Sequence, residues 1–143
     1  MNKSIAIASD HAGLELKSVL VKELETAGLH VLDLGTHSAE SVDYPDYADL
    51  LAAALAEGKA ARGILICGSG IGISIAANRH RHIRAALCHD ATSARFCRLH
   101  NDANVIALGA RLIGVEVAKD AVTTFLNTEF ENGRHAKRVA KLG

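Results

Sequence analysis

The residues with the clearest chemical potential form a glycine-rich turn that begins at a cysteine. The apolar run 63–66 ends at Cys67, the turn 68–72 follows, and a short helix is expected at 73–78. A helix N-terminus presents free backbone N–H groups and partial positive charge, which favour anions. A thiol in such a position forms its nucleophilic thiolate more easily than free cysteine does. The turn therefore predicts a site for an anionic substrate, with Cys67 as the reactive group.

Other phosphate-binding motifs fit this turn less well. A Walker loop needs Lys and then Ser or Thr after its last glycine, but Ile73 follows Gly72. A dinucleotide fingerprint is matched at Gly68 and Gly70 only, although Asp90 lies about twenty residues further on, where a ribose-binding acid is found in that motif. A plainer interpretation makes Cys67 a small residue that fills the end of a buried strand, because free cysteine is among the most buried residue types.

Polar residues at other segment ends add candidates. Asp10 and His11 follow the first apolar run, and His100 lies between a helix and a strand. The spacing of Arg134 and Arg138 places them on one face of a helix, where two guanidinium groups could hold a phosphate or simply be solvated. The histidines of the segment 78–82 alternate with arginines that repel cations, so no metal site is expected there.

Composition narrows the class of protein. The chain has 143 residues, zero formal net charge and only 3% aromatic residues, which argues against nucleic-acid binding. Its N-terminus carries no signal-peptide pattern, and no apolar stretch is long enough to span a membrane. Three cysteines without zinc-pair spacing indicate reduced thiols, and Cys88 and Cys97 are interpreted as core residues. We expect a soluble cytoplasmic protein of one domain, 1–143.

The elements that must position these residues alternate along the whole chain. Strands are predicted at 4–8, 30–34, 63–67, 84–88 and 105–108, and helices at 14–24, 47–57, 73–78, 91–99, 115–126 and in the basic tail 134–142. Short apolar strands separated by helices indicate an α/β fold with a mainly parallel sheet covered on both faces. Ligands bind such sheets at the carboxyl ends of the strands, where Asp10, the Cys67 turn, Asp90 and Arg111 are expected. The order of the fourth and fifth strands stays open.

Several motifs together resemble one enzyme family. They are Asp10-His11, Asp43-Tyr44-Pro45, the run from Cys67 to Asn78, the segment from His100 to Asn104, Gly109-Ala110-Arg111 and Gly133-Arg134-His135-X-X-Arg138. In combination they resemble the type B ribose-5-phosphate isomerases, whose wider family also acts on galactose 6-phosphate and allose 6-phosphate. The resemblance covers nearly the whole chain.

The resemblance implies a three-layer Rossmann-like fold with five parallel strands, a homodimer or tetramer with shared sites, no metal and no cofactor. It implies interconversion of ribose 5-phosphate and ribulose 5-phosphate in the pentose phosphate pathway, with Cys67 as base and His100 as the group that opens the sugar ring. We expect Ser69 to relay a proton, and the tail from about residue 130 to complete the site or the dimer. The implied substrate contacts are Asp10, His11, Tyr44, Gly68, Ser69, Gly70, Ile71, Gly72, Asn101, Arg111, Arg134 and Arg138.

Three alternatives remain open at this point. The same chemistry could act on a six-carbon phosphate such as allose or galactose 6-phosphate. The chain could be a non-catalytic module that binds a nucleotide or a sugar phosphate, with Cys67 only packing. The third alternative is an NAD-dependent oxidoreductase, because Gly68 and Gly70 match part of the dinucleotide-binding fingerprint.

Overall fold

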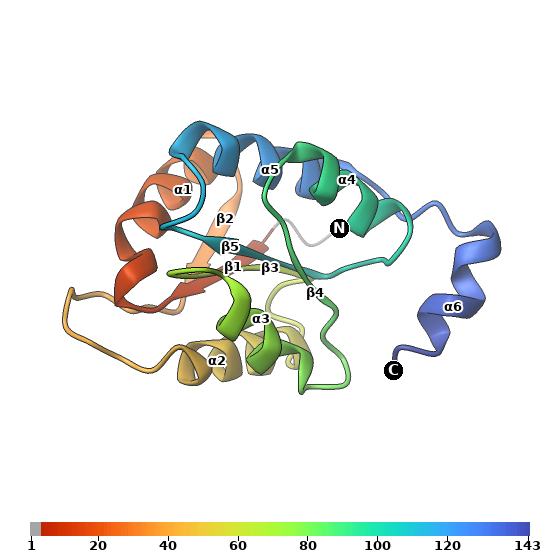
Figure 1. Cartoon of the computed structure of the whole chain (residues 1–143), viewed down its shortest axis with the longest axis horizontal. Coiled ribbons are helices and arrows are strands. Elements are labelled where there is room, and N and C mark those ends of the chain that lie inside the picture. The colour runs from red at the N-terminus through yellow and green to blue at the C-terminus, as the bar shows by residue number, and fades with distance from the viewer. Residues whose placement is uncertain (1–3) are drawn as a thin grey trace.

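Five parallel strands form the centre of the molecule, and helices cover both faces of this sheet (Figure 1). The computed structural model describes residues 4–143. Residues 1–3, where the sequence analysis found no signal-peptide pattern, lie outside the described residues. Within the described part, no helix is both long enough and apolar enough to cross a membrane. The predicted three-layer α/β architecture is confirmed.

The strands agree with the apolar runs in the sequence to within one residue at each end. They are β1 (Ser4–Ser9), β2 (His30–Asp33), β3 (Arg62–Cys67), β4 (Ala85–Leu87) and β5 (Val105–Gly109). Their order in the sheet is β2-β1-β3-β5-β4, which answers the question of strands four and five: β5 pairs with β3, and β4 is the edge strand. Cys67 pairs in register with Gly109, so the cysteine ends the central strand directly beside the end of β5.

The helices divide between the two faces of the sheet. Helices α1 (Leu14–Thr26), α4 (Ala91–Leu99) and α5 (Val115–Asn127) cover one face, and α2 (Tyr44–Ala56) and α3 (Ile71–Asn78) cover the other. The one-turn helix η1 (His11–Gly13) links β1 to α1. Helix α2 begins at Tyr44, three residues before its predicted start, because proline is well tolerated in the first turn of a helix, where Pro45 stands.

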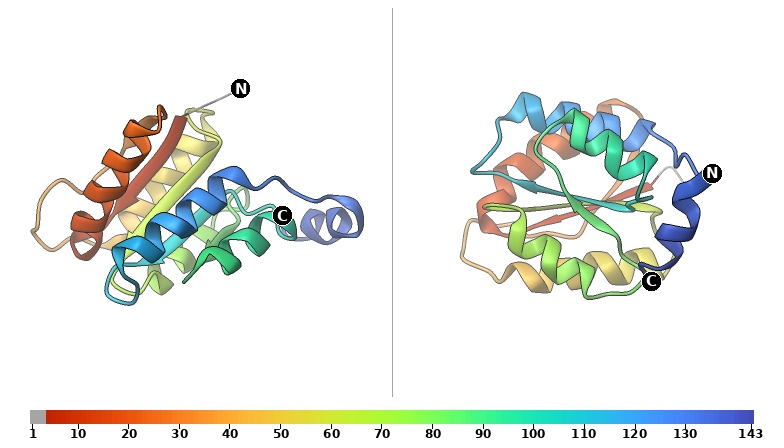
Figure 2. Two further views of the ribbon diagram at one scale, coloured as in Figure 1. Left: turned by 90° about the horizontal axis from the view of Figure 1, so that it is seen from above. Right: turned by 45° about the vertical axis from the view of Figure 1, so that its right-hand side comes forward.

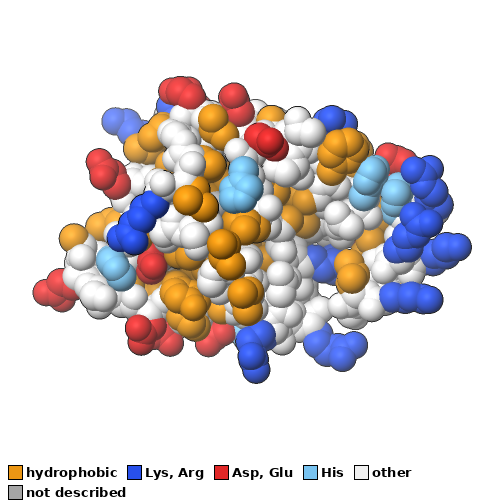
Figure 3. Space-filling model, in the orientation of Figure 1, with side chains coloured by type: hydrophobic (Ala, Val, Ile, Leu, Met, Phe, Trp, Pro, Cys, Tyr) orange, Lys and Arg blue, Asp and Glu red, His pale blue; other side chains and the backbone are white. Residues whose placement is uncertain are grey.

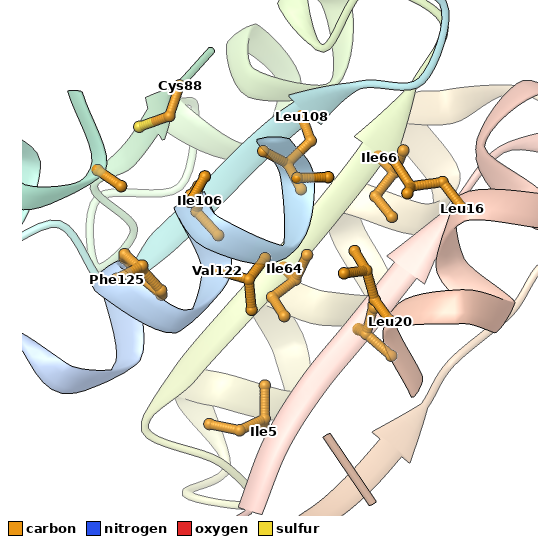
Figure 4. Close-up of a cluster of buried hydrophobic side chains, with 14 of the residues drawn as sticks. Ile5, Leu16, Leu20, Ile64, Ile66, Cys88, Ile106, Leu108, Val122 and Phe125 are labelled. Atoms are coloured by element: carbon orange, nitrogen blue, oxygen red, sulfur yellow. The ribbon is translucent and has the colours of Figure 1, made fainter. Parts of the chain in front are cut away.

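Side chains alternate along each strand, and this alternation determines the face of the sheet on which the Cys67 side chain lies. On β3, Ile64 and Ile66 pack in the cluster under α1 and α5, whereas Leu65 and Cys67 pack in the cluster under α2 and α3. Figure 4 shows the first cluster, with the isoleucines of three strands facing Phe125 and other helix residues. Period-two alternation therefore directs the Cys67 side chain toward the layer that contains α2 and α3.

The C-terminal tail is a separate feature. It consists of the one-turn helix η2 (Gly133–His135) and the short α6 (Ala136–Ala140), so the tail predicted as one helix over 134–142 is broken into two pieces. Figure 2 shows the tail projecting from the side of the three-layer body. It is attached through backbone carbonyls: Arg98 Nε donates to Thr128 O at 2.9 Å, and the Glu131 N–H donates to Leu99 O at 3.1 Å.

Candidate functional site

The turn after β3 folds around the Cys67 sulfur. The Gly70 N–H donates to Cys67 Sγ at 3.2 Å, and the Ile71 N–H donates to Ser69 Oγ at 3.2 Å. Helix α3 then begins at Ile71, with Gly70 at its N-cap. A hydrogen bond donated to sulfur stabilises a thiolate more than a neutral thiol. The turn therefore places a backbone N–H donor on the Cys67 sulfur at the N-terminal end of α3.

Two glycines allow this turn to lie against the end of β5. Gly70 has a φ of 78°, a left-handed conformation that side chains disfavour. A Cβ atom at Gly109 would stand 2.5 Å from the carbonyl oxygen of Ser69, closer than any real contact. Backbone packed this closely fixes the direction of the N–H groups in the first turn of α3. The Gly70 and Ile71 groups are already used, so an oxyanion would meet the remaining first-turn donors, which have no partner inside the helix.

A cavity of about 540 Å³ opens at this turn. Its lining residues are Asp10, Tyr44, Cys67, Gly68, Ser69, Ile71, Gly72, Arg111 and Leu112. Cys67 is only 4% exposed, yet it belongs to this lining. The structure thus brings together eight of the predicted site residues and places the cysteine at the floor of a cavity. Leu112 is an addition that the sequence patterns did not indicate, because an exposed leucine carries no chemical signal.

Asp10 and His11 extend this edge of the sheet. Asp10 is buried, and its carboxylate accepts the Gly13 N–H at 3.1 Å, which caps η1. His11 Nδ1 accepts the Val42 N–H at 3.1 Å, which fixes the ring and its tautomer. His11 is not among the residues that line the 540 Å³ cavity. Asp90 was considered above as the ribose-binding acid of a dinucleotide site. In the structure its carboxylate accepts the Ser93 N–H at 2.7 Å and caps α4.

His100 lies at a second, separate pocket of about 300 Å³. This pocket is lined by His100, Asn101, His135, Arg138, Val139 and Leu142. Because α4 leads to the amino end of β5, His100 stands at the opposite edge of the sheet from Cys67. Within one chain, the predicted site residues therefore fall into two groups, one around Cys67 and one around His100.

In the segment 100–104, some residues stabilise the loop and others line the pocket. Asp102 accepts from Arg98 Nη1 at 2.9 Å, and Asn104 Oδ1 accepts the Arg84 N–H at 2.8 Å. Asp102 has a φ of 47°, a conformation that aspartate tolerates better than most residues. These contacts hold the loop in shape and leave His100 and the exposed Asn101 facing the pocket.

The surroundings of His100 contain a residue to which the sequence assigned no role. The His135 ring stacks on the His100 ring with centroids 4.2 Å apart and planes 16° apart. His100, His135 and Glu131 bring potential ligand atoms within 4.8 Å of one another. Arg134 and Arg138 add positive charge beside this group and repel a cation, so we assign no metal to it.

The surface around the two pockets differs in character. In Figure 3, Lys and Arg side chains gather over the tail at one end of the molecule, where Arg134, Lys137, Arg138 and Lys141 are exposed. Exposed apolar side chains gather over α2 and α3, where Tyr44, Leu50, Ile71 and Ile75 stand. The surface of the tail is thus strongly positive, whereas the surface over α2 and α3 is apolar.

Comparisons with known proteins show which family has this sequence and fold. The sequence matches the Ribose/Galactose Isomerase family over residues 5–142. The chain belongs to that family. It is 49% identical to ribose-5-phosphate isomerase B of Escherichia coli, over 96% of this chain and 92% of the relative. The solved ribose-5-phosphate isomerase B of Clostridium thermocellum superposes with a TM-score of 0.96 at 51% identity, covering 98% of this chain and 95% of that one.

A third relative has a different substrate in its name. The D-erythrulose-4-phosphate isomerase of Pectobacterium atrosepticum is 48% identical over 98% of this chain and 93% of the relative. The family resemblance predicted from the motifs is therefore confirmed, and the chain is an isomerase. The interpretations as an NAD-dependent oxidoreductase and as a non-catalytic module are not supported by these relatives.

Proposed function

We propose that this chain interconverts ribose 5-phosphate and ribulose 5-phosphate, as a step of the pentose phosphate pathway in the cytoplasm. The observation that carries the proposal is Cys67 at the floor of a cavity, with its sulfur accepting the Gly70 N–H. Isomerases named for this reaction share about half of the sequence over nearly the full length.

The proposed chemistry moves one proton between neighbouring carbons. The Cys67 thiolate removes the proton from C2 of the open-chain aldose, which leaves an enediolate, and the proton is returned to C1 to give the ketose. First-turn N–H groups of α3 stabilise the charge that develops on the oxygens, a contribution worth about 3–4 kcal/mol per donor in other oxyanion sites. To the Ser69 hydroxyl, which accepts the Ile71 N–H, we assign the transfer of a proton between the two oxygens.

Substrate binding divides between the two groups of residues. Around Cys67, we assign Asp10 and Tyr44 to the sugar, together with the backbone of 68–72, and His11 and Arg111 to the phosphate. Around His100, we assign Asn101 to the sugar and Arg134 and Arg138 to the phosphate, since arginine offers two donors matched to phosphate oxygens. His100 opens the furanose ring before the base acts.

Joining these groups requires a second copy of the chain. Cys67 and His100 lie at opposite edges of one sheet, and their pockets share no lining residue. A twofold axis would let the tail of one copy reach the Cys67 cavity of the other, and the exposed Ile71 and Ile75 would become buried between the copies. We therefore propose a homodimer whose two sites each contain residues from both chains, and we leave open its pairing into a tetramer.

The reaction is tested by a coupled assay on four-, five- and six-carbon aldose phosphates with a chelator present. We expect ribose 5-phosphate to be the best substrate. A four-carbon aldose phosphate is included because one relative is named for D-erythrulose 4-phosphate. Cys67→Ala should reduce turnover by about 10²–10⁴-fold, the usual contribution of a general base. Cys88→Ala, a buried cysteine away from the cavity, is the matched control. Near-normal turnover by Cys67→Ala would refute the base assignment, and a preference for another chain length would refute the substrate.

The shared site is tested by co-expressing Cys67→Ala and His100→Ala chains with different affinity tags. Each chain alone is inactive, but a mixed dimer contains one site with both native residues. Random pairing of equal amounts should restore about a quarter of the native sites. Purified mixed dimers without activity would show that each chain carries its own complete site.

A further inference from the structure

The His135 side chain is buried without a hydrogen-bond partner on one ring nitrogen. It is 6% exposed, and in the described part of the chain its Nε2 atom has no donor or acceptor within reach. The nearest acidic atom, Glu131 Oε1, stands 3.7 Å away. An unsatisfied buried polar atom destabilises the fold, so a leucine or phenylalanine would suit this position better for stability alone. The position therefore calls for an explanation beyond packing.

The His135 ring stacks on the ring of His100. The two rings are stacked at 4.2 Å with planes 16° apart, and the ring of Phe96 lies 5.0 Å from His100 at a tilt of 46°. Without such contacts, an imidazole on a half-exposed helix end rotates among several orientations. Contacts from two rings restrict His100 to one of them. We propose that His135 is a positioning residue, whose ring holds His100 at the angle needed to open the sugar ring.

The angle matters because ring opening moves protons at two oxygens of the sugar. The proton leaves the hydroxyl on C1, the bond between C1 and the ring oxygen O4 breaks, and O4 gains a proton. A single imidazole serves both oxygens only if its nitrogen stays within hydrogen-bond reach of them while the bond breaks. This inference rests on the ring-opening role proposed above for His100.

The charges around the pair favour an uncharged His135. Burial lowers the pKa of His135, and the positive charge of His100 and Arg134 lowers it further. Arg138 acts in the same direction, and Glu131 alone opposes it. A neutral His135 lets the stacked His100 carry a proton without repulsion at 4.2 Å. Acidification that protonates His135 would place two positive rings face to face and disfavour the working arrangement.

The test compares two reactions that differ only in the need for ring opening. Conversion of ribose 5-phosphate starts from the cyclic sugar. Exchange of the C1 hydrogen of ribulose 5-phosphate with solvent deuterium needs the base and the enediolate, but no ring. His135→Ala should lower kcat for ribose 5-phosphate about tenfold, the upper range for loss of one ring contact, and should change the exchange rate by less than about twofold.

A second variant separates positioning from structure. His135→Phe keeps a flat ring that can stack but cannot take a proton. It should therefore recover most of the kcat that alanine loses and flatten the fall of activity as the pH drops below about 6.5, the ordinary pKa of histidine. His30→Phe, the same substitution at an exposed strand end, is the control. Equal losses in conversion and exchange, or no loss in either, would overturn the proposal. A native protein that catalyses neither reaction would instead refute the function itself.

Discussion

The ring of Tyr44 rests directly on Gly72, so closely that a Cβ atom at that glycine would stand 2.6 Å from the ring. Both residues line the Cys67 cavity, one from the start of α2 and the other from the first turn of α3. Tyr44 is 39% exposed and can swing outward, so the contact sets the shape of the cavity more than the stability of the fold.

Gly72→Ala should therefore change substrate binding while leaving stability almost intact. The alanine displaces the Tyr44 ring, and we expect KM for ribose 5-phosphate to rise about three- to tenfold with a smaller effect on kcat. Alanine in a helix gains about 1 kcal/mol over glycine, which offsets the cost of moving the ring. Gly114→Ala, where a Cβ atom meets nothing within 4 Å, is the matched control. A large fall in Tm with unchanged KM would contradict this prediction.

Gly70→Ala should reduce both stability and activity, because the backbone beside Gly70 cannot move away. The added Cβ atom would stand 2.8 Å from the carbonyl carbon of Leu108, in addition to the cost of a φ of 78°. We expect a loss of about 2–4 kcal/mol in the free energy of unfolding, measured by urea denaturation, together with most of the activity. Gly58 has a similar φ of 75°, and a Cβ atom there would meet nothing within 4 Å. Gly58→Ala therefore measures the cost of placing alanine in a left-handed conformation without any steric clash. Equal losses in the two variants would show that the contact with β5 is unimportant.

Breaking the ion pair between Lys17 and Asp33 from one side should be strongly destabilising. Lys17 is 2% exposed, and its Nζ donates to both carboxylate oxygens of Asp33 at 2.7 Å. Lys17→Met leaves a carboxylate that is largely enclosed, and we expect a loss of about 3 kcal/mol, the lower range for a broken buried pair, because Asp33 keeps some access to water.

The double variant Lys17→Met/Asp33→Asn should be less destabilised than the single variant, since it removes both charges. Lys59→Met breaks an exposed pair with Glu57 and should change stability by less than about 1 kcal/mol. Urea denaturation at one pH measures all three. A double variant as unstable as Lys17→Met would mean that packing of the lysine chain, and not its charge, is what matters.

His135 should make the fold less stable in acid. Its pKa is lowered in the folded chain, chiefly by burial, whereas in the unfolded chain it returns to about 6.5. The unfolded state therefore binds the proton more readily, so this contribution is fully present above about pH 6.5 and is lost as the pH falls through the lower folded value. Far-UV circular dichroism in urea at pH 7.5 and pH 5 should show a smaller acid-induced loss for His135→Phe than for the native chain. An equal loss in both would contradict the assignment.

Much of the fold follows from local patterns. Short runs of Ile, Leu, Val and Ala predict all five strands, and the cysteine–glycine turn with its helix is recognisable because its residue types have few other uses together. The start of α2 was predicted late, since Asp43-Tyr44-Pro45 also fits a loop, although Pro45 is compatible with the first turn of the helix and Tyr44 packs on Gly72 there.

Long-range relationships could not be predicted in the same way. Nothing local specifies that β5 lies between β3 and β4, because that order depends on which faces pack best. The motifs named Cys67 and His100 together, but their places at opposite edges of the sheet emerge only from the topology. His135 was passed over because one histidine in a basic tail has the pattern of a solvated residue, and its burial comes from contact with the end of α4.

The attachment of the tail has an evolutionary consequence. Residues 128–132 lead from the end of α5 to η2 outside the sheet, and they are held to α4 by the hydrogen bonds of Thr128 O with Arg98 and of the Glu131 N–H with Leu99 O. An insertion or deletion there would shift Arg134, His135 and Arg138 as one unit and leave the base and its turn untouched. A lineage could in this way adapt the same catalyst to longer or shorter sugars by changing one hinge.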